Sequence, residues 1–261
     1  MENSKFSWLL ARNGGYDEKP ETGSCAKHGG YSFRAFFDKQ TGERVGAIGA
    51  ACATCYEERK AADDEAEAMR YFREDQAAAG VPLRYADAKL SAIEQSANGN
   101  KVILEFLAYA KQFQNTPPTS GLILLGPPGT GKTHLSCALV SSVVFRRKSA
   151  RYVTAQGMIR AIRATWERGA EKSEGAVIEQ HASPSLLVID EVGVQVGSEN
   201  ERGLIFEVIN RRYNALKPTI LAGNCTLAEL PKFIDERALD RMREGEGKAL
   251  LFNWPSLRKT A

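Results

Sequence analysis

The residues best suited to chemistry form an octapeptide, Gly-Pro-Pro-Gly-Thr-Gly-Lys-Thr, at positions 126–133. It follows the apolar run 121–125 and precedes a stretch with helical spacing at 134–140. Strand, glycine-rich loop and helix, in this order, are the context in which the G-x-x-x-x-G-K-[ST] motif binds phosphate. The glycines let backbone N–H groups curl around a phosphate, and the start of the helix adds partial positive charge. The pattern therefore predicts a site for a nucleoside triphosphate.

Two side chains of the motif have defined roles in such a site. Lys132 is expected to reach the β- and γ-phosphates of ATP, and the Thr133 hydroxyl to bind Mg²⁺. The other residues expected to contact the nucleotide are Gly126, Pro127, Pro128, Gly129, Thr130, Gly131 and His134. The alternative is a glycine-rich turn that happens to carry a lysine. It is disfavoured because every motif position and both flanking elements are present.

Acidic and amide side chains follow two later apolar runs. Asp190 and Glu191 come directly after the run 185–189, and Asp190 lies 58 residues beyond Lys132. Asp190 is predicted to hold Mg²⁺, and Glu191 to orient and polarise the attacking water. Asn224 ends the next predicted strand, where it could hydrogen-bond the γ-phosphate or that water. Its alternative role is a turn-forming residue after a glycine.

A second set of chemically capable residues lies near the N-terminus. Cys25 and His28 form one x₂ knuckle, and Cys52 and Cys55 form another after 23 intervening residues. Three thiols and one imidazole are a ligand set suited to tetrahedral Zn²⁺. The strand-like insert 31–37 and the turn at Thr41-Gly42 support a metal-stapled module with few aliphatic residues of its own. The role is expected to be structural, since four protein ligands leave no open position; the alternative is reduced surface cysteines beside an unrelated histidine.

The elements that must position these residues alternate along the second part of the chain. Beyond the phosphate loop the pattern predicts strands at 150–154, 185–189, 218–222 and 249–252, with helices near 156–168, 200–215 and 234–243 and an earlier one at 101–114. Such alternation predicts an α/β fold with a parallel sheet flanked by helices. Ligands of such folds bind at the carboxyl ends of the strands, where Asp190, Glu191 and Asn224 are placed.

Between these parts, residues 57–79 predict one helix rich in Ala, Glu and Arg, stopped by Gly80-Val81-Pro82. It could be a plain connector or a handle for a partner protein. Its segment 57–76 carries a net charge of −4, whereas 146–172 carries +6. The basic segment is a candidate polyanion contact, although such runs are usually solvated faces. The predicted domains are a zinc-binding module at 1–56, the helix at 57–79 and an ATPase domain at 80–261.

Composition excludes several classes of protein. The chain has 261 residues, of which 43% are hydrophobic and 26% charged, so it is globular rather than disordered. No apolar run approaches the roughly 18 residues of a membrane helix, and we expect a cytoplasmic protein with no membrane partner. Five cysteines, an odd number, argue for thiols or metal ligands rather than a disulfide framework.

Arginines near the C-terminus complete the candidate residues, because phosphoryl transfer needs positive charge on the developing transition state. Arg237, Arg241 and Arg243 lie on the predicted helix 234–243, and Arg258 follows the last predicted strand. Arg237 and Arg241 are four residues apart and so share a helix face. Composition alone would make all four arginines surface salt-bridge partners.

The combination of phosphate loop, Asp-Glu strand end and strand-terminal Asn resembles the AAA+ ATPases. Within them, the segments Glu236–Arg243 and Phe252–Arg258, together with Gly80–Tyr85, resemble the DnaC-type replicative helicase loaders. The resemblance covers about residues 80–258 well. The N-terminal Cys/His cluster is similar to that of phage and prophage members of this group, and this second likeness, over residues 25–76, is looser.

This resemblance implies roles for single residues. Arg241 would be an arginine finger acting on ATP bound by a neighbouring subunit, with Arg237 beside it. Arg258 would be the sensor-2 arginine that touches the γ-phosphate in its own chain, and Asn224 the sensor-1 residue. The family lacks a helical lid domain after the core, and only three residues follow Arg258 here.

The resemblance also implies partners and an activity. These are a hexameric replicative DNA helicase held by the N-terminal region, single-stranded DNA contacted by the basic segment, and self-association through ATP-bridged interfaces. The expected activity is a slow ATPase, stimulated by DNA or a partner, that delivers the helicase to single-stranded DNA. The zinc module in place of a plain helical N-terminus is a departure from the family. Two alternatives stay open: an IstB-like ATPase subunit of a transposition system, and a zinc-dependent interaction module whose nucleotide site is merely structural.

Overall fold

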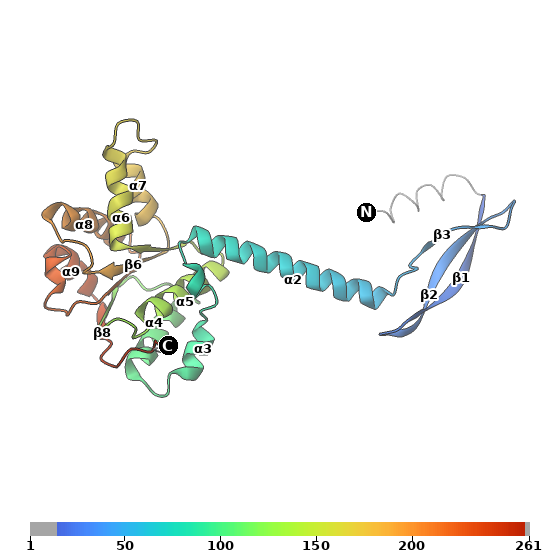
Figure 1. Cartoon of the computed structure of the whole chain (residues 1–261), viewed down its shortest axis with the longest axis horizontal. Coiled ribbons are helices and arrows are strands. Elements are labelled where there is room, and N and C mark those ends of the chain that lie inside the picture. Colours follow the sequence, from blue (N-terminus) through green and yellow to red (C-terminus); the bar gives the residue numbers. More distant parts are fainter. Residues whose placement is uncertain (1–14, 259–261) are drawn as a thin grey trace. The chain divides into compact units, whose positions relative to one another are not determined.

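The computed structural model describes residues 15–258 (Figure 1). The chain divides into two compact units, Met1–Arg70 and Tyr71–Ala261. This division falls inside the long helix α2 (Ala53–Ala78) rather than at either of its ends. The three domains expected at 1–56, 57–79 and 80–261 therefore remain a prediction, and residues 1–14 of the first lie outside the described residues.

The first unit is built on a small antiparallel sheet. Its strands β1 (Tyr16–Cys25), β2 (Gly29–Asp38) and β3 (Arg44–Ile48) pair in the order β1-β2-β3. The predicted strand at 31–37 lies within β2, and the turn at Thr41-Gly42 lies between β2 and β3. Strand β1 was not predicted, because it contains Pro20 and mostly polar residues. Proline is compatible with β1 because β1 is an edge strand.

Helix α2 begins at Ala53, four residues before the predicted start at Glu57. Its first turn therefore carries Cys55, one of the candidate metal ligands. The helix ends at Ala78, and Gly80 follows with a positive φ of 84°, as the predicted stop requires.

The second unit contains a five-stranded, wholly parallel sheet. The strands lie in the order β5 (Ala150–Thr154), β6 (Leu186–Val192), β7 (Thr219–Gly223), β4 (Leu122–Leu125) and β8 (Lys248–Leu251). All five match predicted strands to within three residues. The first strand of this unit along the chain, β4, lies between β7 and the edge strand β8, so the phosphate loop leaves the sheet one strand in from an edge.

Helices cover both faces of this sheet (Figure 1). Alternate residues of β4 point to opposite faces, so Leu122 and Leu124 join one hydrophobic cluster, and Ile123 and Leu125 join the other. The first cluster is built with α3 (Leu90–Ser96), α4 (Lys101–Gln112) and α5 (Lys132–Phe145). The second is built with α6 (Ala155–Arg163), α7 (Glu174–Ala182), α8 (Glu199–Asn214) and α9 (Glu236–Arg243). The predicted α/β fold with a helix-flanked parallel sheet is confirmed.

Helix ends follow ordinary capping chemistry. The Asn100 side chain accepts hydrogen bonds from the first backbone N–H groups of α4, and Ser198 and Glu201 form a capping box at the start of α8. Short 3₁₀ turns occur at Leu83–Tyr85, Ala164–Trp166 and Leu230–Lys232. Within residues 15–258, no helix has the length and apolar character needed to cross a membrane.

Candidate functional site

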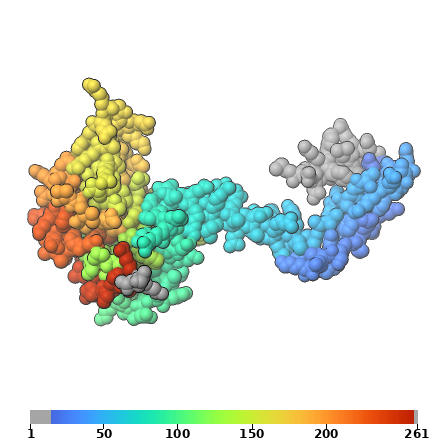
Figure 2. Space-filling model, viewed as in Figure 1, coloured from blue at the N-terminus to red at the C-terminus, as the bar shows by residue number. Residues whose placement is uncertain are grey.

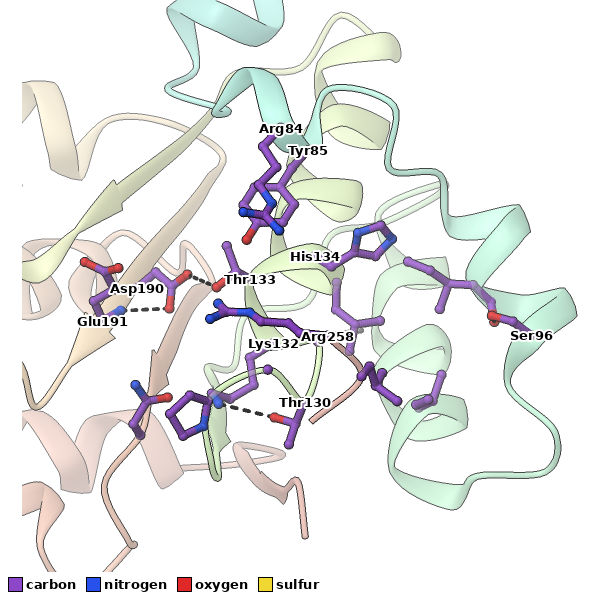
Figure 3. Close-up of a pocket in the computed structure, with 18 residues that line it drawn as sticks. Arg84, Tyr85, Ser96, Thr130, Lys132, Thr133, His134, Asp190, Glu191 and Arg258 are labelled. Atoms are coloured by element: carbon purple, nitrogen blue, oxygen red, sulfur yellow. Dashed lines mark hydrogen bonds between the residues drawn. The ribbon is translucent and has the colours of Figure 1, made fainter. Parts of the chain in front are cut away.

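The candidate nucleotide site is a cavity of about 620 Å³ at the carboxyl end of the parallel sheet (Figure 3). Its wall collects most of the side chains and loop residues predicted for the site, from Pro128 to His134 together with Asp190, Glu191, Asn224 and Arg258. This volume falls within the range of ordinary small-molecule pockets, roughly 300–1,000 Å³. Four separate chain segments thus converge on one cavity of the size needed for a nucleotide.

The phosphate loop is tightly packed, and two of its glycines are required sterically. A Cβ at Gly126 (φ 146°) would collide with the carbonyl of Phe252, and one at Gly129 (φ 81°) would collide with Ser256. Lys132 opens α5 and is 6% exposed. Its ammonium donates to the carbonyls of Gly126 (2.6 Å) and Pro127 (2.8 Å). The Lys132 ammonium thus donates its hydrogen bonds to the loop itself, and it could exchange these carbonyls for phosphate oxygens.

Burial lowers the pKa of Lys132 below its ordinary value, and the positive charge of Arg258 acts in the same direction, whereas Asp190 opposes the shift. Two cations and one carboxylate thus act on each other across the cavity. Such an arrangement suits an anionic ligand, because a polyphosphate would relieve the repulsion between Lys132 and Arg258.

The Asp190 carboxylate is the best-anchored polar group of the site and is only 3% exposed. Its Oδ2 accepts hydrogen bonds from the hydroxyls of Thr133 (2.7 Å) and Tyr152 (2.8 Å), and its Oδ1 accepts from the backbone N–H of Glu191 (2.7 Å). Burial and the negative charge of Asp190 raise the pKa of the Tyr152 phenol, which therefore stays protonated and donates. Thr133 and Asp190 have the oxygen chemistry that Mg²⁺ requires, and they already touch each other.

Glu191 differs from Asp190 in both exposure and backbone geometry. Its side chain is exposed, and its φ is 57°, the left-handed region that non-glycine residues seldom adopt. Non-glycine residues in this region often occur at functional sites. Glu191 and Asn224 line the same cavity as Lys132, from the ends of neighbouring strands β6 and β7.

The C-terminal segment, drawn in red in Figure 2, contacts the phosphate loop through two hydrogen bonds. The Trp254 indole N–H donates to the carbonyl of Thr130 (3.2 Å), and the Leu257 N–H donates to that of Gly129 (2.8 Å). These contacts hold the backbone just before Arg258 and direct its side chain into the cavity (Figure 3). Sequence reasoning placed Arg258 but not its supports, because hydrogen bonds to loop carbonyls have no spacing signal.

Residues that precede the phosphate loop also line the cavity, although no role was predicted for them. They include Arg84 and Tyr85, in the first 3₁₀ turn, and Ile93 and Ser96 of α3. The Tyr85 ring lies edge-on to the ring of His134, 6.3 Å between centroids. Because the sequence of residues 80–85 resembles that of the helicase loaders, the resemblance was a signal from which a position at the nucleotide site could have been predicted.

Arg241 and Arg237 do not line this cavity. The Arg241 guanidinium lies over the rings of Phe206 (4.8 Å) and Tyr213 (5.3 Å), and one of its nitrogens, Nη1, is buried without a hydrogen-bond partner. Arg237 lies over the Phe206 ring as well (4.3 Å), is also held by both carboxylate oxygens of Asp235 and is 69% exposed. Neither arginine can complete the site of its own chain in this arrangement.

The second candidate site is the Cys/His cluster of the first unit. The ligand atoms of Cys25, His28, Cys52 and Cys55 all lie within 4.8 Å of one another. The Nδ1 of His28 lies 3.3 Å from the sulfur of Cys55 and 3.5 Å from that of Cys52, and the sulfurs of Cys25 and Cys55 are 3.5 Å apart. A tetrahedral zinc site with bonds of about 2.0–2.3 Å needs ligand separations of roughly this size. The four residues therefore fit Zn²⁺ in chemistry and in spacing.

Neighbouring groups support this use of the cluster. The Nε2 of His28 lies 3.2 Å from the Glu58 carboxylate, so Nδ1 is left as the ligand atom, and Lys27 pairs with the same carboxylate at 2.6 Å. A carboxylate on the far nitrogen is a common partner of metal-bound histidine. The backbone N–H groups of Lys27 and His28 lower the pKa of Cys25 to about 6, whereas the hydrogen bond with Cys25 raises the pKa of Cys55 to about 11, so Cys25 is the first thiol of this pair to ionise. This favours the thiolate that a metal requires.

The basic segment 146–172 does not form a single exposed patch. Several of its side chains have partners within the chain: Arg147 pairs with Asp75, Lys148 donates to the Phe113 carbonyl, and Arg163 pairs with Glu201. Exposed cations of this segment lie at the end of α5, on α6 at Arg160, and in the loop between α6 and α7. The expected polyanion contact is therefore narrower than the net charge of +6 indicated.

The phosphate loop after an interior parallel strand, the buried Asp190 and the converging polar residues define a P-loop ATP-binding protein. The family model described as IstB-like ATP binding protein matches residues 64–242. The chain belongs to this family.

Individual proteins similar to this chain include replicative helicase loaders. The chain is 35% identical over 150 residues to the replicative helicase loader DnaC of Escherichia coli K12, a match that covers 58% of this chain and 60% of DnaC. It is 32% identical over 159 residues to DnaC of Buchnera aphidicola subsp. Baizongia pistaciae, covering 61% and 64%. The matches thus span about three fifths of these relatives. The homology with DnaC is clear from both.

Two solved structures share the fold of the core. The crystal structure of the DnaC helicase loader matches with a TM-score of 0.56 and 24% identity, over 66% of this chain and 99% of that one. The crystal structure of DnaI matches with a TM-score of 0.55 and 18% identity, over 68% and 94%.

Proposed function

We propose that this protein is an ATP-dependent loader that binds a replicative DNA helicase and delivers it to single-stranded DNA. One observation carries the proposal: the phosphate loop, Asp190, Glu191, Asn224 and Arg258 line one cavity of nucleotide size. The homology with the DnaC loaders supports the choice of helicase as the partner.

Each residue of the cavity has a task in this proposal. Lys132 leaves the carbonyls of its own loop for the β- and γ-phosphates of ATP, and Thr133 and Asp190 hold Mg²⁺, which neutralises phosphate charge. Glu191 orients and polarises the attacking water, while Asn224 and Arg258 contact the γ-phosphate.

The proposed reaction needs a second subunit. Arg241 lies outside its own cavity, and its partly unpartnered guanidinium is set between two aromatic rings. In the proposal, it acts on ATP bound by a neighbouring subunit. ATP would thus favour an assembled, DNA-binding form, and hydrolysis would release it. A site that is complete only at an interface predicts a slow ATPase that is stimulated by a partner or by DNA.

A test is co-purification of the full-length chain with the replicative helicase of its host, in ATP, in ADP and without nucleotide. We expect nucleotide-sensitive capture of the helicase, and Lys132→Ala should remove the sensitivity. Helicase capture should be accompanied by ATP-dependent binding of single-stranded DNA, with salt-sensitive affinity and little sequence preference. Failure to bind the helicase in every nucleotide state would overturn the proposal.

A second candidate is the ATPase subunit of a transposition system, and the IstB-like description of the family model favours it. This candidate predicts a preference for duplex DNA and no capture of helicase. Parallel binding measurements on single strands and duplexes of equal length separate the two. The zinc-dependent interaction module with a structural nucleotide site predicts ATP binding without turnover, so an ATPase assay with added single-stranded DNA separates it as well.

A further inference from the structure

We propose that Tyr152 is a positioning residue that holds the Asp190 carboxylate in place for Mg²⁺. This inference rests on the proposed nucleotide site and adds to it a residue outside the motifs. Tyr152 is 8% exposed, does not line the cavity, and belongs to the hydrophobic cluster beneath it. It would therefore act through Asp190 and never touch the nucleotide.

The register of the sheet explains how Tyr152 reaches this carboxylate. Tyr152 on β5 pairs with Val188 on β6, and Asp190 lies two residues further along β6. Because strand side chains alternate, Val188 and Asp190 lie on the same face. Tyr152 is thus the diagonal neighbour of Asp190, and a tyrosine is long enough to bring its hydroxyl within 2.8 Å of Oδ2. A phenylalanine could fill the same space without the hydrogen bond.

The two hydroxyls that donate to Asp190 Oδ2, those of Thr133 and Tyr152, are expected to behave differently when Mg²⁺ and nucleotide bind. Thr133 lines the cavity, and its hydroxyl is the one that the motif assigns to Mg²⁺. Tyr152 approaches from the protein core, so its hydrogen bond can persist. It would then be the side-chain donor that keeps Oδ2 oriented, and a buried carboxylate without such a donor would lose both orientation and hydrogen-bond energy.

Tyr152 is itself held firmly, at the outer edge of the sheet. Strand β5 is an edge strand, and its free side at this position is covered by the turn that ends α2. The Tyr152 N–H donates to the Ala79 carbonyl (2.7 Å), and at Gly80 a Cβ would collide with the Tyr152 carbonyl. Gln76, one turn earlier, donates to Ser141 of α5 (2.8 Å). The turn therefore fixes the backbone from which the phenol reaches Asp190.

The test is a magnesium titration of nucleotide binding, read by a fluorescent ATP analogue on the full-length protein. Tyr152→Phe should raise the Mg²⁺ concentration at half-maximal binding about 10-fold, the lower end of the usual effect of such outer partners. Tyr109→Phe is the matched control. Its hydroxyl is also partly buried, but donates to the Ser120 carbonyl away from the cavity. This control should titrate as the wild type does.

A second comparison separates positioning from a general loss of stability. In an Asp190→Ala background, Tyr152→Phe should cause no further change in the magnesium titration, because the carboxylate that it positions is already gone. An equal further change there would overturn the inference, as would a wild-type titration in Tyr152→Phe. If the wild-type protein itself shows no magnesium-dependent nucleotide binding, the proposed function fails instead, so the two failures are distinguishable.

Discussion

The two units of this protein differ in how much apolar surface each one buries in its own interior. In the described part of the first unit, residues 15–70, the buried apolar side chains are Ala35, Phe36 and Cys52. The second unit has two hydrophobic clusters, one on each face of its parallel sheet. A small sheet with so little apolar burial needs another source of stability, whereas the parallel sheet does not.

This difference determines how structure and site are related in each unit. In the second unit, packing builds the sheet, and the sheet then presents Asp190, Glu191 and Asn224 at its carboxyl edge. In the first unit, the residues that would bind zinc are also the residues that join the strands to α2. Fold and site are separable in one unit and inseparable in the other, and this contrast can be tested.

The largest expected effect is that of zinc removal on the first unit. Structural zinc contributes an apparent free energy of about 10–16 kcal/mol at pH 7 in small zinc modules. Cys52→Ser, or a strong chelator, should therefore unfold residues 15–56, as measured by limited proteolysis and by the zinc content of the purified protein. The affinity for ATP should stay unchanged, because the nucleotide cavity is built entirely by the second unit. Unchanged protease resistance without zinc would refute the contrast.

The next largest effect concerns whether one copy of the second unit can hydrolyse ATP without a neighbouring subunit. Arg241→Ala should lower stimulated ATP turnover by about 10³-fold or more, as for other arginines that act in trans, with ATP affinity preserved. Arg237→Ala is the companion variant, and it should have a smaller effect because Asp235 already holds that guanidinium.

A mixing experiment makes the test of Arg241 sharper. The Lys132→Ala protein cannot use its own cavity but still offers Arg241, so adding it to the Arg241→Ala protein should restore part of the turnover. Equal loss of ATP binding and turnover in Arg241→Ala, without recovery on mixing, would show that Arg241 does not act across an interface.

A smaller effect is expected for the phosphate loop itself. Lys132→Ala removes the two hydrogen bonds that we propose the ammonium makes to the β- and γ-phosphates of ATP. Each such bond from a charged donor contributes about 1.5–3 kcal/mol, so the variant should bind ATP about 100-fold more weakly or worse. Lys217→Ala is a suitable control, since that lysine donates to the Ser183 carbonyl and does not line the cavity. Isothermal titration with ATP measures both variants. Equal affinities would exclude Lys132 as the phosphate ligand.

Much of this arrangement could be predicted from local signals. The octapeptide, the Asp-Glu strand end and the 150–154 strand are short patterns in which one segment carries its own evidence. The cluster of Cys25, His28, Cys52 and Cys55 was also predictable, because metal ligands in paired knuckles have a characteristic spacing. Each of these predictions depends on residues that are near one another in sequence.

What could not be predicted depends on contacts between distant segments. Tyr152 meets Asp190 only after β5 and β6 have paired in one particular register. Trp254 meets Thr130 across 124 positions of sequence. Strand β1, with Pro20, is acceptable only as an edge, and being an edge is a property of the folded sheet. Local pattern identifies the groups that touch a ligand better than the groups that hold them.

The smallest expected effect concerns Glu58, which does for the zinc cluster what we propose Tyr152 does for Asp190. Its carboxylate lies 3.2 Å from the Nε2 of His28, and such outer partners typically change metal affinity by about 10-fold or more. Glu58→Ala should therefore lower zinc affinity about 10-fold in a chelator competition, without unfolding the unit at saturating zinc. Glu57→Ala, an exposed neighbour of the same charge on α2, is the control. Equal zinc affinities of the two variants would mean that only the four direct ligands matter, and that the parallel between the two units ends there.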